Sequence, residues 1–136
     1  MIQVIAGNKG SGKTKRLIDL TNTTAREAAH DVIFLDDDNR YMFDVDHKVR
    51  FINAEDYHIH SADMFIGFLC GILSSNFDVG TVFIDAFLKL CHCPLDGVEP
   101  VVRVLNELGV KHQVDFVLSL SADPEVLPDC LKQYVI

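Results

Sequence analysis

Residues 7–14 constrain this chain more than any other part of its sequence. They read G-N-K-G-S-G-K-T and match the pattern G-x-x-x-x-G-K-[ST]. Glycines let a backbone turn tightly, so that successive amide hydrogens point into one concavity where an anion can bind. The apolar residues 2–6 before this segment predict a short buried strand, and the residues after it predict a helix. A strand, a glycine-rich turn and a helix N-terminus in this order predict a phosphate-binding loop.

The two residues that end this segment carry the most specific expectations. Lys13 supplies a full positive charge for the β- and γ-phosphates of a nucleoside triphosphate, and Thr14 supplies a hydroxyl oxygen for Mg²⁺. The rest of the loop cradles the phosphates with backbone amides. The candidate phosphate-binding residues are therefore Gly7, Asn8, Lys9, Gly10, Ser11, Gly12, Lys13 and Thr14.

Strand-like and helix-like segments alternate along the rest of the chain. Short apolar runs predict strands at residues 2–6, 32–35, 49–52, 81–84 and 114–120, with a last edge strand at 133–136. Helical periodicity predicts helices at 13–29, 62–75 and 95–108, the second capped by Ser61 and the third stopped by Gly109. This alternation predicts a three-layer α/β/α sandwich with a mainly parallel sheet of about five strands, and residues 1–136 as one domain.

Several side chains are expected to be buried in that sandwich. For the first helix we expect an inward stripe of Leu17, Leu20, Thr24 and Ala28. For the helix at 95–108 we expect Val98, Val101, Val102, Leu105 and Leu108 to face inward. Cys70 and Cys130 lie in apolar segments, which predicts buried thiols.

An aspartate ends the fourth predicted strand and is the candidate partner of the loop. Residues 81–84 are apolar, and Asp85 follows them directly. Ligands of parallel α/β sheets bind at the carboxyl ends of the strands, where Gly7, Asp85 and Ser121 are all predicted to lie. A carboxylate supplies the hard oxygen that Mg²⁺ prefers, so Asp85 is a candidate for holding this ion. The alternative is that Asp85 only caps the turn after the strand.

On these residues the chain resembles the P-loop NTPases, with residues 7–14 as Walker A and residues 81–85 as Walker B. The order of elements is similar to that of the RecA-like group and of thymidine kinase, which has a D-x-R-Y-like stretch comparable to Asp38-Asn39-Arg40-Tyr41. The resemblance implies ATP and Mg²⁺ as cofactors and catalytic roles for Lys13 and Asp85. It also shows departures, since Ala86 stands where many members have a catalytic glutamate. The zinc-bearing lasso of thymidine kinases has no counterpart up to Ile136.

For other residues the sequence leaves two hypotheses open. Asp36, Asp37 and Asp38 either face the γ-phosphate in place of the missing glutamate or form a solvated acidic turn. Ser119 and Ser121 either sense the γ-phosphate or cap the segment at Pro124. Arg40, Arg50 and Arg103 are candidates for an arginine finger and otherwise surface arginines. Residues 91–93, C-H-C, lack the paired spacing of a zinc site, even with His58 or His60, and indicate incidental thiols.

Net charge and the distribution of apolar residues limit the classes of partner that this chain can bind. The formal net charge of −8 argues against a nucleic-acid partner, because nucleic-acid affinity rests mainly on Lys and Arg. No signal peptide and no bilayer-length apolar run are visible, so we expect a cytoplasmic protein. The apolar helix at 62–75 is expected to be core, with a surface for a second copy or a protein partner as the alternative, because a chain of this size can hide only a limited apolar area.

Three functions follow from these expectations. The first is ATP binding with weak or partner-dependent ATPase activity. The second is a small-molecule or nucleoside kinase, and the third is a non-catalytic nucleotide-dependent switch.

Overall fold

The computed structural model describes residues 1–136 and forms one five-stranded sheet with helices on both faces. The strands are β1 (Ile2–Gly7), β2 (Asp31–Asp36), β3 (Val49–Asn53), β4 (Val79–Ile84) and β5 (Asp115–Ser121). The α-helices are α1 (Lys13–Glu27), α2 (Ala62–Ser75), α3 (Phe87–Leu90), α4 (Glu99–His112) and α5 (Asp129–Lys132). Short 3₁₀ turns are η1 (Ala54–Tyr57), η2 (Leu95–Gly97) and η3 (Pro124–Val126). The predicted parallel α/β sandwich is confirmed.

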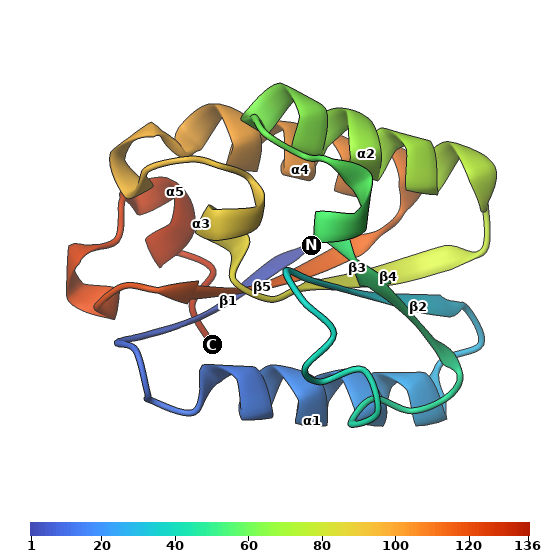
Figure 1. Ribbon diagram of the computed structural model, residues 1–136. Coiled ribbons are helices and arrows are strands. Elements are labelled where there is room, and N and C mark those ends of the chain that lie inside the picture. The colour runs from blue at the N-terminus through green and yellow to red at the C-terminus, as the bar shows by residue number, and fades with distance from the viewer.

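The strand order is β1-β5-β4-β2-β3, and every pair is parallel. Figure 1 shows α1 below the sheet and α2 and α4 above it. The right-handed rule for parallel crossovers explains this division. The chain crosses the sheet in one direction from β1 to β2 through α1, and it returns in the other through α2 and α4. Strand β5 therefore lies between β1 and β4, so the loops after these three strands are neighbours at the carboxyl edge of the sheet.

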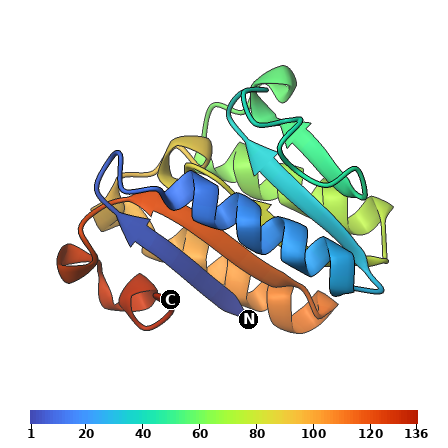
Figure 2. The same ribbon diagram turned by 90° about the horizontal axis from the view of Figure 1, so that it is seen from below.

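Two apolar cores lie on the two faces of the sheet. Alternate residues of β4 point to opposite cores, since Val82 and Ile84 pack beneath α2 and α4 while Phe83 packs against α1. The core on the α1 face is the smaller one, and α1 is the only helix that covers it (Figure 2). Tyr41 and Val45, from the segment between β2 and β3, complete its cover.

The predicted inward stripe of α1 is confirmed in part. Leu17 is buried as expected, and Leu20 and Ala28 are half-buried and pack against the core on this face. Thr24 is half-buried, and the other buried residues of the helix are Ile18, Thr21 and Ala25. Thr21 can face inward because its hydroxyl donates a hydrogen bond to the Leu17 carbonyl oxygen at 2.7 Å. A threonine whose hydroxyl is satisfied within its own helix behaves as an apolar residue toward the sheet.

Helix α4 begins and ends later than its sequence predicts. Residues 95–97 form a 3₁₀ turn, and the α-helix starts at Glu99 with Pro100 in its first turn. Gly109 does not stop it, because the left-handed residue at its end is Gln113, with φ 56°. Gly109 serves packing instead: a Cβ there would lie 2.9 Å from the Val114 carbonyl oxygen. The expected inward residues are buried apart from Leu108, which is half-buried.

Three smaller expectations are also corrected. Cys70 is exposed on the outer side of α2 and Cys130 is half-buried, so neither is the buried thiol that its apolar neighbours predict. Residues 133–136 form no strand and make a single parallel bridge, Val4 with Val135, beside β1. None of the helices combines the length and the apolar run that crossing a lipid bilayer requires.

Candidate functional site

The loop between β1 and α1 leaves a helix N-terminus open to an anion. Gly10 and Gly12 have φ of 85° and 84°, a left-handed conformation in which any side chain is strained. Gly12 occupies the N-cap of α1, and no side chain caps the helix there. The first turn of α1 also lacks an acidic residue. The first amide groups of α1 are therefore free to donate to a bound anion, which the helix dipole also attracts.

The loop folds back on itself over Gly7 and Asn8. A Cβ added to Gly7 would collide with the Ser11 hydroxyl, so only glycine fits there without a shift of Ser11. The Ser11 amide and the Lys13 ammonium both donate to the Asn8 carbonyl oxygen, each at 3.1 Å. Lys13 makes no ion pair with a carboxylate within 4.0 Å. Its charge is therefore held over the loop without a protein counter-ion.

Asp85 receives hydrogen bonds from two other elements. The Thr14 hydroxyl of α1 lies 3.1 Å from Asp85 Oδ2 and 3.3 Å from Oδ1. The Ser119 hydroxyl of β5 donates to Asp85 Oδ1, and Ser119 Oγ accepts from the Ala86 amide at 3.0 Å. Asp85 and Ser119 are 6% and 1% exposed, so this arrangement is fixed in the interior of the site. Ser121, by contrast, is exposed and faces the pocket described below.

We expect Ser119→Ala to destabilise the fold by about 1–3 kcal/mol, the cost of leaving buried hydrogen-bonding groups without a partner. The Ala86 amide would lose its acceptor, and Asp85 would lose a donor. Urea unfolding measures the change. Ser121→Ala is the matched control and should stay within about 0.5 kcal/mol, because Ser121 is exposed. Equal effects of the two substitutions would contradict the structural role of Ser119.

Asp36 is not part of a solvated turn. It ends β2 beside β4, is 1% exposed, and its Oδ2 has no hydrogen-bond partner. The Asp37 amide donates to Asp36 Oδ1 at 2.7 Å. Burial raises the pKa of Asp36 to about 8, and the hydrogen bond with the Asp37 side chain and the negative charge of Asp85 add to this increase. The solvated-turn hypothesis is therefore wrong for this residue.

The next two acids carry cation partners. The Asp37 carboxylate forms an ion pair with Lys89 of α3. Asp38 Oδ2 lies 3.6 Å from Nη2 of the Arg40 guanidinium. Burial opposes ionisation of Asp37, but hydrogen bonds with Lys89 and Asp36 outweigh it and hold the pKa of Asp37 below its usual value. Lys89 could not be identified from the sequence, because α3 is a four-residue helix without a periodic pattern.

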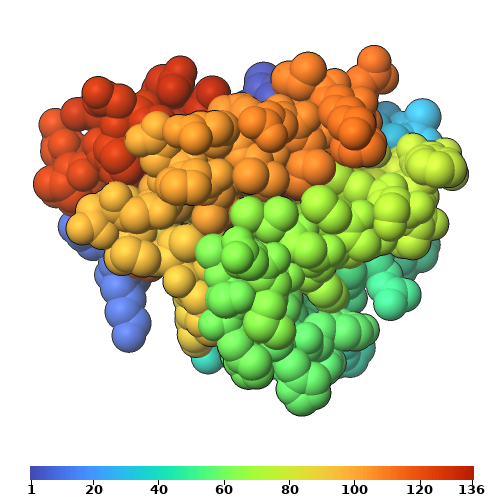
Figure 3. Space-filling view, turned by 90° about the horizontal axis from the view of Figure 1, so that it is seen from above, coloured from blue at the N-terminus to red at the C-terminus, as the bar shows by residue number.

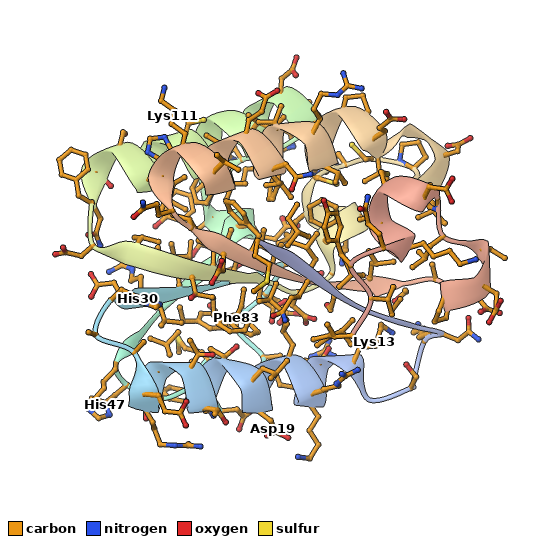
Figure 4. The ribbon with its side chains drawn as sticks, turned by 180° about the vertical axis from the view of Figure 1, so that it is seen from behind. Lys13, Asp19, His30, His47, Phe83 and Lys111 are labelled. Atoms are coloured by element: carbon orange, nitrogen blue, oxygen red, sulfur yellow. The ribbon has the colours of Figure 1, made fainter.

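A pocket of about 820 Å³ opens over the loop on the α1 side of the sheet edge. One wall is the loop with Asp85, Ala86, Ser119 and Ser121. The other wall continues to Asp19 and Asn22 of α1 and to the segment after β2, through Arg40, Tyr41 and Asp44. In Figure 4, Lys13 and His47 lie at opposite ends of α1, with Asp19 on the outer side between them.

The far wall of this pocket is anchored to α1 by one asparagine. Asn22 Nδ2 donates to the Asp44 carbonyl oxygen at 2.9 Å, and the Asp46 amide donates to Asn22 Oδ1 at 2.7 Å. These bonds hold residues 44–46 against α1, and Arg40 and Tyr41 of the same segment line the same pocket as the glycine loop. A side chain from this segment can therefore reach a ligand that sits on the loop.

The three candidate arginines lie in different places. Arg40 lines the pocket, with its guanidinium 5.8 Å from the centre of the Tyr41 ring. Arg103 pairs with Glu99 on the exposed side of α4, and Arg50 lies on edge strand β3. Of the three, the structure brings only Arg40 to the site.

The cysteine pair and the two histidines proposed with it do not gather into a metal-binding cluster. Cys91 is buried and donates to the Leu88 carbonyl oxygen, while the rings of His58 and His60 lie 6.4 Å apart before α2. Burial and the neighbouring Cys93 raise the pKa of Cys91 to about 12, so its thiol stays protonated at neutral pH. The three side chains whose ligand atoms gather within 4.8 Å of one another are Asp36, Asp37 and Asp38.

The parallel sheet, with β5 between the strand of the glycine loop and the strand of Asp85, defines an α/β protein of the RecA-like fold class. A solved structure supports this assignment: the crystal structure of the KaiC-like protein PH0186 from the hyperthermophilic archaeon Pyrococcus horikoshii OT3. The TM-score is 0.62 at 15% sequence identity, over 98% of this chain and 68% of that chain. This likeness shows the fold alone. No family model and no curated protein matches the sequence.

Proposed function

We propose that residues 1–136 act as one nucleotide-binding domain that binds ATP with Mg²⁺ and hydrolyses it weakly or only with a partner. The observation that carries this proposal is the meeting of three groups at one sheet edge. They are the uncapped N-terminus of α1, the Lys13 ammonium without a counter-ion, and the Thr14 hydroxyl 3.1 Å from Asp85. Amide dipoles and one ammonium would bind the phosphates.

The residues beside the loop fit a magnesium ion. Mg²⁺ prefers hard oxygen ligands and commonly takes one or two from protein carboxylates and hydroxyls, with phosphates and water completing the shell. Thr14 and Asp85 would supply these oxygens, and Ser119 orients Asp85 toward Thr14. When bound, the ion neutralises charge on the phosphates. Lys13 would hold the terminal phosphates, and the amides at the start of α1 would bind the β-phosphate.

Weak hydrolysis follows from Ala86. A methyl side chain can neither orient nor deprotonate a water molecule, and positioned acid–base groups contribute about 10²–10⁴-fold to rates. Asp36 is a buried carboxylate that could take the part of the missing glutamate. It ends the strand next to β4 and has one free oxygen. Asp36 does not line the pocket, so its free oxygen can reach a water molecule only if bound nucleotide opens a path to it. We propose that Asp36 orients the attacking water in that nucleotide-bound state.

Calorimetry tests the binding step directly. ATP, GTP and their diphosphates are titrated into the chain with Mg²⁺ and again with EDTA. We expect heat with ATP that weakens in EDTA, and slow phosphate release in a parallel assay. Absence of heat with every nucleotide in Mg²⁺ would overturn the proposal. Rapid release by the isolated chain would contradict only the weak-turnover part.

The extent of the pocket favours a second candidate, phosphoryl transfer to a small acceptor. The pocket continues beyond the loop to Arg40, Tyr41 and Asp44, which leaves room for a molecule opposite the terminal phosphate. This candidate corresponds to the thymidine-kinase-like reading. Screening nucleosides and small alcohols for transfer of labelled phosphate tests it, and no transfer to any acceptor would exclude it.

A third candidate is a switch whose nucleotide state a partner reads. Phe43 is 90% exposed on the segment that borders the pocket, where a bound nucleotide could alter its position. With Ala86 after Asp85, slow turnover would preserve the bound state. Steady-state ATP turnover, measured for the chain alone and with candidate partners, separates this candidate from an ATPase. A switch should hydrolyse ATP slowly under both conditions.

Arg40→Ala should reduce turnover by about tenfold or more, because Arg40 is the candidate arginine that lines the pocket and can contact charge on a transferring phosphoryl group. Arg103→Ala is the matched control, since Arg103 lies on α4 away from the pocket. Steady-state phosphate release measures both variants. Equal rates for wild type and Arg40→Ala would remove Arg40 from the site.

A further inference from the structure

A second hollow lies between edge strand β3 and helix α2, and it shares no residue with the nucleotide pocket. This groove has a volume of about 600 Å³. Its walls include Arg50 and Ile52 of β3, Tyr57 of η1, and Gly67, Phe68 and Gly71 of α2. The groove runs along one edge of the helical face that Figure 3 shows, where α2 lies beside α4.

The backbone of β3 is open along this groove. β3 lies at the end of the sheet and pairs only with β2, so one row of its amide and carbonyl groups has no strand partner. Val49 and Phe51 pack on the α1 face, whereas Arg50 and Ile52 line the groove. A strand added beside β3 would therefore place every second side chain over the groove.

Two glycines keep the groove open. Gly67 and Gly71 lie one turn apart inside α2, where glycine destabilises a helix relative to alanine. A Cβ at either position would meet no atom within 4 Å. Packing within this chain therefore requires neither glycine, and the room that they leave lies outside the chain.

The charge of the groove selects its occupant. The chain carries a net charge of −8, yet no carboxylate lines the groove, and its charged residue is Arg50, which forms no ion pair. Within residues 1–136 the exposed aromatics Phe43 and Phe77 lie in turns and not in an extended segment. The unpaired charge of Arg50 then favours an occupant that carries a carboxylate. We propose that β3 and this groove bind an extended segment of a partner protein as an added strand, with its carboxylate on Arg50 and an apolar side chain over the two glycines.

Capped hexapeptides test this proposal with the full chain. Two peptides are used, and each carries one glutamate and one phenylalanine two residues apart, with valines at the other positions. The two peptides differ in the order of the glutamate and the phenylalanine. We expect ¹⁵N chemical-shift changes confined to β3 and α2, and slower amide exchange in β3. Gly71→Leu, which fills the groove, and Arg50→Glu, which reverses its charge, should each weaken binding about thirtyfold or more, as loss of an interface anchor does.

The controls separate docking from folding. Gly71→Ala adds one methyl group without filling the groove and should raise the melting temperature of the free chain. Arg26→Glu makes the same charge change on α1 and should bind as wild type does. The proposal is overturned if neither peptide binds at millimolar concentration, or if Gly71→Leu and Arg50→Glu bind normally while folded. Self-association of the chain that Arg50→Glu abolishes would also overturn it, because the occupant would then be a second copy.

Discussion

Lys13→Ala should lower affinity for ATP by roughly 100-fold or more, while the free energy of unfolding changes by less than about 0.5 kcal/mol. Lys13 is a cation of the glycine loop, and its one hydrogen bond within the chain goes to the Asn8 carbonyl oxygen at 3.1 Å. That bond is exposed, so its loss costs little. The loss of affinity is large because the phosphates would lose the full charge that the loop amides cannot replace.

Calorimetry and urea unfolding on the same preparation measure the two effects. Lys111→Ala is the control for net charge, since Lys111 lies on α4, across the sheet from α1 and the loop (Figure 4). It should bind ATP as wild type does. If Lys13→Ala and wild type bind ATP equally, the phosphate-binding assignment of residues 7–14 fails. If both variants unfold, Lys13→Gln provides a second test.

The glycine loop could be predicted from sequence because its determinants are local. Gly10 and Gly12 take φ values that other residues resist, and the strand before them and the helix after them are continuous with the loop in the chain. Asp85 could also be predicted to lie near it, since parallel strands present their carboxyl ends at one edge. The same rule places Ser119 and Ser121 near this edge, but it does not predict which of the two hydroxyls faces Asp85.

Features set by tertiary packing could not be predicted. Thr21 of α1 faces the sheet although it is polar, because its hydroxyl is satisfied within the helix. Gly109 resembles a helix stop in sequence, yet a close contact with the Val114 carbonyl oxygen requires it. The burial of Asp36 depends on β2 lying between β4 and β3, a strand order that no local pattern encodes. The ion pair of Asp37 with Lys89 depends on the same order.

Asp36→Asn should stabilise the chain by about 2–4 kcal/mol at pH 8 and by almost nothing near pH 4. The pKa of Asp36 is raised from 3.8 to about 8 in the folded chain. Between these values the unfolded chain has released this proton and the folded chain has kept it. Stability must then fall as the pH rises from about 4 to about 8, because the unfolded state binds fewer protons. Asparagine cannot ionise, so the variant lacks this loss.

Urea unfolding in EDTA from pH 4 to pH 8 measures the gap between variant and wild type. Asparagine keeps the acceptor for the Asp37 amide, so the fold should persist. Asp38→Asn is the matched control. Its carboxylate is half-exposed and pairs with Arg40, so this variant removes one negative charge from the same turn without removing a buried group. A variant at Asp36 that is less stable than wild type at pH 8 would show that Asp36 is ionised and stabilised by a partner.

The same substitution should act in the opposite direction on function. If Asp36 orients the attacking water, Asp36→Asn should reduce phosphate release by about 10²-fold or more while ATP binding persists. A group that costs stability yet supports turnover is what a buried carboxylate at a reaction site entails, since its surroundings are arranged for the reaction and not for its own solvation. Greater stability with unchanged turnover would leave Asp36 as a buried acid without a catalytic part, and would assign water positioning to a partner.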